Sequence, residues 1–247
     1  KNISLQEILE SAKFSKHDLC SEIVYEFPEL QGVMGGKYLR REGFSDNVSL
    51  AVSEHYLPRF YKDRLPSSVY GAITSLSDKL ETIISMFFIG KRPSGSSDPF
   101  ALRRNLNGVI QIIWKFEFTI KIDELISDLL KYWLNDFQKI NCDYENVYKE
   151  LCEFIKQRIL NYLEESNFDK DIINSISSHN LGENKIFDIF DLKNRIRSLQ
   201  KLKYNKNSEA IINLFSRYSK LANTSTVKTN KFLNEIIIND ELFEKDT

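Results

Sequence analysis

The chain has few of the residues and runs that would cross-link it or anchor it in a membrane. Its 247 residues include three cysteines, Cys20, Cys142 and Cys152, and no CxxC pair. A reducing cytoplasm with free thiols is therefore favoured over disulfides or a zinc site. The longest apolar run, 83–89, is interrupted by Ser85 and falls far short of the roughly 20 residues that a membrane span needs. The sequence thus indicates a cytoplasmic protein without a membrane segment.

Net charge is nearly absent as well. With 34 Lys and Arg against 35 Asp and Glu, the formal charge is −1, so any nucleic-acid surface must come from local clusters. A hydrophobic content of 42% is enough for one or two cores, since domains usually run to roughly 100 to 200 residues. Lys1 opens the chain without an initiator Met or a signal-peptide pattern. We therefore expect a piece of a longer polypeptide.

Familiar catalytic signatures are missing too. The sequence has no GxxxxGK[ST] phosphate loop, no GxGxxG fingerprint and no GxSxG elbow. His179 lies near the end of a predicted helix, where a capping or cationic role is commoner than catalysis. We predict no catalytic residue, no metal ligand and no cofactor in this chain.

Proline and glycine are confined to the first part of the chain. All five prolines lie at or before Pro99, and after Gly108 the only glycine is Gly182. Short helices with shaped loops are therefore expected first and longer, simpler helices later, with an extended connector within 109–122. Capping residues and apolar spacing of three and four predict an all-α protein. The expected helices are 15–27, 46–57, 66–90, one from Asp98-Pro99, and then 123–137, 143–163, 169–178, 188–202 and 208–222.

One dyad suggests metal chemistry. His17 and Asp18 spell the pair of the HD phosphohydrolases, in which such side chains hold a metal that activates water. His55 and Asp78 could supply further ligands, but hydrolases of that kind need a histidine upstream of the dyad, and none lies before His17. The competing interpretation is structural: Asp18 caps a helix, His55 lies beside the helix stop at Pro58, and Asp78 with Lys79 is an ordinary helix-face pair.

Three strings are more specific than any packing rule demands. They are Glu26-Phe-Pro-Glu-Leu-Gln-Gly-Val-Met-Gly35, Glu54-His-Tyr-Leu-Pro-Arg59 and Asp98-Pro-Phe-Ala-Leu-Arg-Arg104. In this order and at this spacing they resemble the β subunit of the bacterial two-subunit glycyl-tRNA synthetase. The resemblance also takes in Leu65-Pro66, Gly71, Ser77-Asp-Lys-Leu80 and Phe88-Ile-Gly90, and it is dense from 16 to 108.

The resemblance implies a domain order and a function. An HD-domain-like helical domain that has lost its metal chemistry is expected over 1–108, and a helical linker over 109–185. Part of a DALR-type anticodon-binding helical domain is expected over 186–247. The chain would be a C-terminal portion of a β subunit that holds the glycine tRNA, while a separate α subunit uses ATP and Mg²⁺ to attach glycine. The alternatives are a metal-dependent HD-type phosphohydrolase and a helical interaction scaffold without RNA.

The first predicted RNA contact is the segment 91–104. Lys91 and Arg92 open a loop rich in serine and glycine, and we expect Arg103 and Arg104 one turn into a helix that begins at Asp98-Pro99. Amides, hydroxyls and guanidinium groups suit phosphate oxygens. The competing interpretation is that Asp98 caps the helix and that the two arginines pair with acidic helices.

The second predicted contact is the segment 185–231, which holds eleven Lys and Arg against three Asp and Glu. Such an excess, with Tyr204 and Tyr218 available for stacking on unpaired bases, suits an anticodon surface. Lys193, Arg197 and Lys201 recur at a spacing of four, although a charge run can also be a solvated face. Over both segments the predicted RNA contacts are Lys91, Arg92, Arg103, Arg104, Arg195, Arg197, Lys201, Lys203, Arg217 and Lys220.

Overall fold

The computed structural model describes residues 3–137, 142–180 and 188–224. These residues form helices and connecting segments, with an isolated β-bridge between Ser94 and Ser97 and no named strand. The predicted all-α class is therefore confirmed. The chain divides into two compact units, residues 1–200 and residues 201–247. None of the described helices is long and apolar enough to cross a lipid bilayer.

The first unit begins with short helices and continues with longer ones. The short elements are α1 Leu5–Phe14, the 3-10 turn His17–Cys20, α2 Glu22–Glu26, the 3-10 turn Pro28–Leu30, α3 Val33–Arg41 and α4 Asp46–Glu54. The longer helices are α5 Val69–Phe88, α6 Leu102–Phe116, α7 Ile122–Asp136, α8 Tyr144–Glu165, α9 Lys170–Asn180 and α10 Ile189–Lys203. The second unit holds the end of α10 and α11, Ser208–Thr224.

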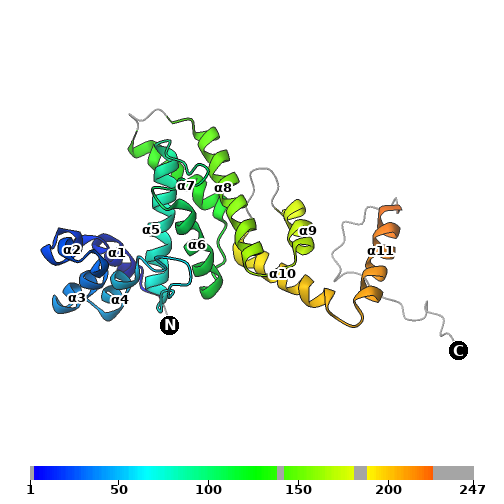
Figure 1. Cartoon of the computed structure of the whole chain (residues 1–247), viewed down its shortest axis with the longest axis horizontal. Coiled ribbons are helices and arrows are strands. Elements are labelled where there is room, and N and C mark those ends of the chain that lie inside the picture. The colour runs from blue at the N-terminus through cyan, green and yellow to red at the C-terminus, as the bar shows by residue number, and fades with distance from the viewer. Residues whose placement is uncertain (1–2, 138–141, 181–187, 225–247) are drawn as a thin grey trace. The chain divides into compact units, whose positions relative to one another are not determined.

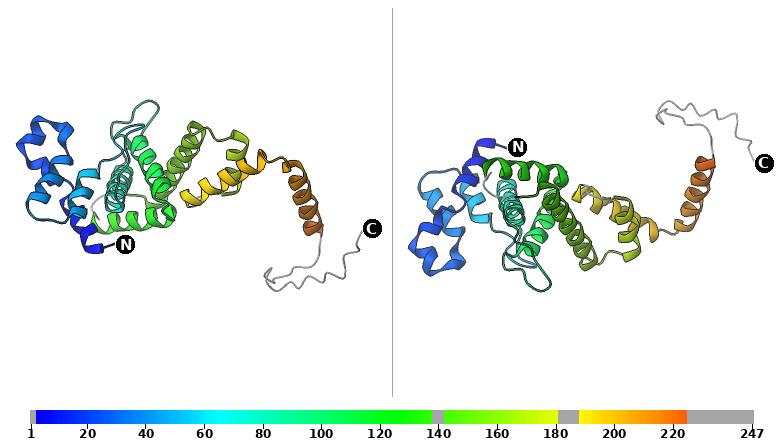
Figure 2. Two further views of the ribbon diagram at one scale, coloured as in Figure 1. Left: turned by 90° about the horizontal axis from the view of Figure 1, so that it is seen from below. Right: turned by 90° about the horizontal axis from the view of Figure 1, so that it is seen from above.

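Helix α5 is the central element of the first unit. Figures 1 and 2 show α1 to α4 gathered on one side of α5, with α6, α7 and α8 on the other. Both sides of α5 are apolar, so the helix is buried along most of its length. One apolar cluster runs from α5 to α10, and among its fully buried members are Ile83, Ile110, Ile126, Leu151 and Ile196.

The five helices expected after 122 are confirmed to within a few residues, because their caps are local. The Asp143 side chain accepts a hydrogen bond from Asn146 N at the start of α8, and the Asp188 side chain accepts one from Phe190 N at the start of α10. The predicted domain limits at 108 and 185 stay predictions. The HD-like and DALR-like assignments also stay predictions.

The helix expected over 15–27 is wrong. Ser21 is extended (φ −94°, ψ 140°), and its side chain accepts a hydrogen bond from Val24 N, so it caps a separate α2. In the helix expected over 46–57, the sequence pattern favours Asp46 as the cap, but Ser45 caps α4 instead. Helix α4 ends at Glu54, well before Pro58. Sequence patterns locate helix ends only approximately, because several nearby polar residues can serve as the cap.

Candidate nucleic-acid interface

The buried carboxylate of Asp18 organises the first string. Its Oδ2 accepts hydrogen bonds from Gly32 N at 2.7 Å and from Gly35 N at 2.9 Å. Gly32 has φ +80°, a conformation that L side chains rarely adopt, and a Cβ on Gly35 would lie 3.2 Å from the carboxylate. Asp18 therefore holds the start of α3. This is a capping role, as one interpretation of the dyad expected, but it acts on a helix more distant in the sequence.

The two histidines of the HD hypothesis bind backbone. His17 Nδ1 lies 2.5 Å from Phe14 O, and His55 Nδ1 lies 2.6 Å from Val52 O. Burial lowers the pKa of His55, which favours a neutral ring that donates its Nδ1 proton. Among the described residues, no three His, Cys, Asp or Glu side chains come close enough together to hold a metal. The geometry thus gives both histidines a structural role.

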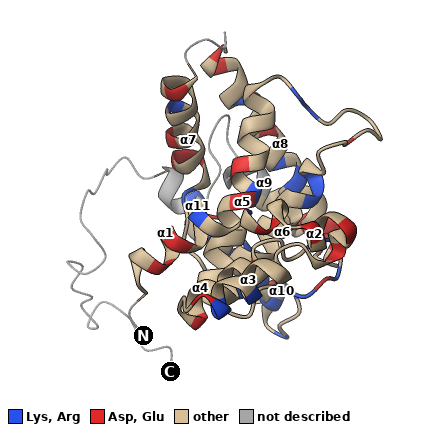
Figure 3. Cartoon of the chain, turned by 90° about the vertical axis from the view of Figure 1, so that its left-hand side faces the viewer, with Lys and Arg blue, Asp and Glu red and all other residues tan. Residues whose placement is uncertain are grey.

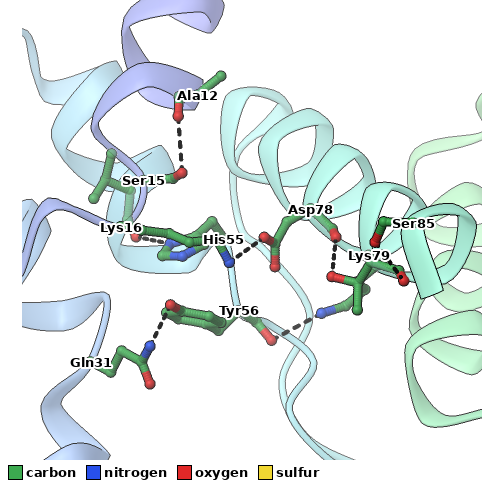
Figure 4. A network of polar contacts seen from close by, with 11 residues as sticks. Ala12, Ser15, Lys16, Gln31, His55, Tyr56, Asp78, Lys79 and Ser85 are labelled. Carbon is green, nitrogen blue, oxygen red and sulfur yellow. Dashed lines mark hydrogen bonds and ion pairs between the residues drawn. The ribbon is translucent and has the colours of Figure 1, made fainter. Parts of the chain in front are cut away.

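A polar network joins the second string to the first string and to α5 (Figure 4). Tyr56 OH accepts a hydrogen bond from Gln31 Nε2 at 2.5 Å, and Lys16 Nζ lies 5.2 Å from the Tyr56 ring centroid. The same Lys16 ammonium pairs with Asp78 Oδ1 at 2.5 Å. Asp78 thus has a cationic partner. Tyr56 contacts both Gln31 of the first string and the Lys16 ammonium that pairs with Asp78 of α5.

The first residue of the second string, Glu54, holds the start of α5. Its carboxylate accepts hydrogen bonds from the backbone N–H and the hydroxyl of both Ser67 and Ser68, at 2.6 to 3.3 Å. Ser68 in turn caps α5 by accepting from Gly71 N at 2.9 Å. A Cβ on Gly71 would lie 2.3 Å from Glu54 Oε2, so the glycine leaves room for the carboxylate.

The last residue of the second string, Arg59, fastens the first string. Its guanidinium donates to Glu29 O at 3.0 Å and to Gln31 O at 2.9 Å. Its own backbone N–H donates to Asp63 Oδ2 at 2.8 Å, and the preceding Leu57–Pro58 peptide is cis. The two strings are therefore parts of one interlocked structure.

In the third string, Asp98 starts α6 from a distance. The carboxylate accepts hydrogen bonds from Leu102 N at 2.8 Å and Arg103 N at 3.0 Å, while Ala101 lies in the left-handed region at φ 54°. The helix begins at Leu102 and not at Asp98-Pro99. The expectation that Arg103 and Arg104 lie one turn into the helix is therefore wrong, because both belong to its first turn.

The start of α6 borders a hollow of about 270 Å³, which we call the arginine hollow. It is lined by Pro58, Phe60, Tyr61, Asp98, Arg103, Arg104, Asn107, Gly108, Gln111 and Arg158. Two of the predicted contacts, Arg103 and Arg104, thus line the same hollow as Arg158 of α8. Sequence reasoning missed Phe60, Tyr61 and Arg158. The run Arg59-Phe-Tyr-Lys62, adjacent aromatics flanked by cations, was the available signal.

Basic and acidic residues are otherwise interspersed along the helices (Figure 3). Arg92 pairs with Glu150 of α8, and its guanidinium lies 5.6 Å from the Phe87 ring centroid. The loop that contains Lys91 closes in a tight turn, with reciprocal backbone hydrogen bonds between Ser94 and Ser97. Lys91 is exposed, whereas Arg92 is held against the body of the first unit.

The second basic segment is described in part. Arg197, Lys201, Lys203, Arg217 and Lys220 are exposed, whereas Arg195 pairs with Asp191 at 2.6 Å. Lys185, Lys228, Lys231 and the side chain of His179 lie outside the described residues.

Lys193 does not share the face expected for it with Arg197 and Lys201. It is buried, and its Nζ donates to Trp114 O at 3.2 Å and lies 4.9 Å from the Trp114 ring centroid. Burial lowers the pKa of Lys193. The side chain therefore fastens α10 to α6.

Lys79 is also buried, so the idea of an ordinary helix-face pair with Asp78 is wrong. Only 3% of Lys79 is exposed, and its Nζ donates to Tyr56 O at 3.1 Å. A Cβ on Gly108 would lie 2.8 Å from Lys79 Cε, so the glycine provides the space that the lysine stem occupies. Burial lowers the pKa of Lys79 to about 8.

This pKa predicts a pH dependence of stability. The folded value of about 8 lies below the ordinary 10.5, so between them the unfolded chain binds more protons than the folded one. The free energy of unfolding therefore gains a contribution as pH rises through this window. In Lys79→Met that gain should be smaller by up to roughly 3 kcal/mol, as measured by urea unfolding at the two ends of this pH window. The exposed Lys37→Met is the control and should follow the wild type, and an equal gain in both variants would contradict the assignment.

Comparison with known proteins points in one direction. The family described as "Glycyl-tRNA synthetase beta subunit" matches residues 1–178. The glycine--tRNA ligase beta subunit of Trichodesmium erythraeum is 36% identical over 246 residues, which cover 98% of this chain and 34% of the relative. That of Gloeothece citriformis is 37% identical over 245 residues, with the same coverage. That of Halothermothrix orenii is 39% identical over 201 residues, which cover 81% of this chain and 28% of the relative. The chain thus spans about a third of the first two relatives.

Proposed function

Because the chain belongs to the glycyl-tRNA synthetase β-subunit family, we propose that it is a tRNA-binding part of a two-subunit glycine–tRNA ligase. In this proposal the chain holds the glycine tRNA in the cytoplasm. A separate α subunit, with ATP and Mg²⁺, carries out the attachment of glycine. The observation that supports the proposal most is the arginine hollow, which three arginines line next to the strings that carry the family resemblance. Phosphate contacts of this kind supply much of the affinity of proteins for nucleic acids.

The second basic segment fits the same role. Its cations are exposed on α10 and α11, and so are the rings of Tyr204 (70%) and Tyr218 (65%). Aromatic side chains among cations are what single-stranded RNA needs, because each unpaired base offers a face for stacking. We therefore propose that this segment contacts the anticodon side of the tRNA, as a DALR-type domain would.

The paired arginines of α6 give a direct kinetic test. In the full α and β complex, Arg103→Ala with Arg104→Ala should raise the Michaelis constant for tRNA by roughly tenfold or more, since charge-assisted hydrogen bonds are lost. The Michaelis constant for glycine should stay unchanged. The matched control is Arg40→Ala with Arg41→Ala, an exposed arginine pair at the end of α3. An unchanged Michaelis constant for tRNA would contradict the proposed contact, whereas equal effects on both substrates would indicate a folding defect.

The second basic segment is tested by charge reversal. Arg197→Glu with Lys201→Glu in the full-length subunit should weaken tRNA binding and flatten its salt dependence by about one unit of slope for each lost phosphate contact. Lys131→Glu with Lys149→Glu changes the net charge equally on exposed positions of α7 and α8 and serves as the control. If affinity is unchanged while circular dichroism shows intact helices, the segment is a solvated face.

A further inference from the structure

The arginine hollow has an excess of positive charge that the protein itself does not neutralise. Among the described residues, neither Arg103 nor Arg104 has an ion-pair partner. The acidic group in the lining, Asp98, is occupied by the two backbone N–H groups at the start of α6. Glu165, at 3.2 Å, neutralises Arg158 alone. Three arginines against the carboxylates of Asp98 and Glu165 leave one net positive charge, and within the described part of the chain Arg103 and Arg104 have no ion pair that a bound anion would have to break.

One cation of the hollow is already held in place. Arg158 Nε donates to Asn107 Oδ1 at 2.5 Å, and only 16% of the Arg158 side chain is exposed. Because Asn107 Oδ1 is used in this way, the amide nitrogen of Asn107 is the group that can donate to a ligand. Such fixed polar groups lower the ordering cost of binding.

The aromatic part of the hollow is exposed. Phe60 and Tyr61 are each 59% exposed, although they line a cavity in which a base could cover them. Lys62 Nζ lies 5.4 Å from the Tyr61 ring centroid and adds a further cation beside that ring. Adjacent open rings among cations are typical of sites where a base stacks and its phosphate is bound.

Part of the lining of the hollow joins the second string to α6. Pro58, from the second string, and Gly108, on α6, meet there, since a Cβ on Gly108 would lie 3.3 Å from Pro58 Cγ. A volume of about 270 Å³ lies just under the roughly 300 Å³ at which drug-sized ligand sites begin. The hollow therefore suits one nucleoside better than a segment of duplex.

We propose that the arginine hollow binds one unpaired nucleotide of the tRNA. The base stacks on Phe60 or Tyr61, the adjacent phosphate contacts Arg103 and Arg104, and the Asn107 amide nitrogen donates to the base edge. The inference rests on the proposed function. It adds the kind of nucleotide that is bound, because the site requires a base outside an RNA duplex. Paired bases hide their faces within the duplex and cannot stack on a side chain.

The test uses the full-length β subunit together with its α subunit and glycine tRNA. Phe60→Ala with Tyr61→Ala should weaken tRNA binding by about tenfold, as loss of one stacking contact predicts. The slope of affinity against salt should stay unchanged, because no phosphate contact is removed. In chemical probing, one unpaired nucleotide that the wild type protects should become reactive. Tyr25→Ala with Tyr132→Ala, exposed tyrosines on α2 and α7, is the control and should match the wild type.

The outcomes separate this inference from the proposed function. If the wild-type complex binds tRNA and the Phe60 and Tyr61 variant binds within twofold of it with intact circular dichroism, the nucleotide site is overturned while tRNA binding stands. Loss of affinity without a newly reactive unpaired nucleotide would also overturn it. If the wild-type complex does not bind glycine tRNA at all, the proposed function fails first.

Discussion

The first unit depends on the buried carboxylate of Glu54, which holds the start of its central helix, α5. It satisfies the backbone N–H and the hydroxyl of Ser67 and of Ser68, where the chain turns into α5. Helix α5 is flanked by α1 to α4 on one side and by α6 to α8 on the other, so its start fixes both halves. A charge is tolerated at this depth because four donors meet it at a helix N-terminus, where the partial positive charge favours an anion.

The strings that carry the family resemblance mostly hold the fold together, and the proposed binding surface lies where they meet the solvent. Asp18 fixes α3 and Arg59 fastens the first string. Asp98 starts α6, and this places Arg103 and Arg104 in the lining of a hollow that Pro58 also lines. The scaffold and the proposed site therefore share residues. This explains why residues that hold the fold and cationic side chains of the proposed site are neighbours in the sequence.

The all-α class and the later helices were predictable because caps and apolar spacing are local signals, as at Asp143. The break between the 3-10 turn at 17–20 and α2 was not, since it accompanies hydrogen bonds that Asp18 accepts from residues 14 and 17 positions further on. The burial of Lys79 depends on space beside Gly108 that only tertiary packing creates. For the same reason Arg158 was missed, because it reaches the arginine hollow from α8, 51 positions beyond its hydrogen-bond partner Asn107.

The central claim is that the strings that carry the family resemblance stabilise the fold, and that the Glu54 carboxylate does so by holding the start of α5. Urea unfolding of Glu54→Gln, followed by far-UV circular dichroism, tests this most directly. The amide keeps the shape of the side chain but replaces an acceptor with a donor that faces other donors. We expect the free energy of unfolding to fall by about 1 to 3 kcal/mol with an unchanged denaturant slope. A variant as stable as the wild type would contradict the claim.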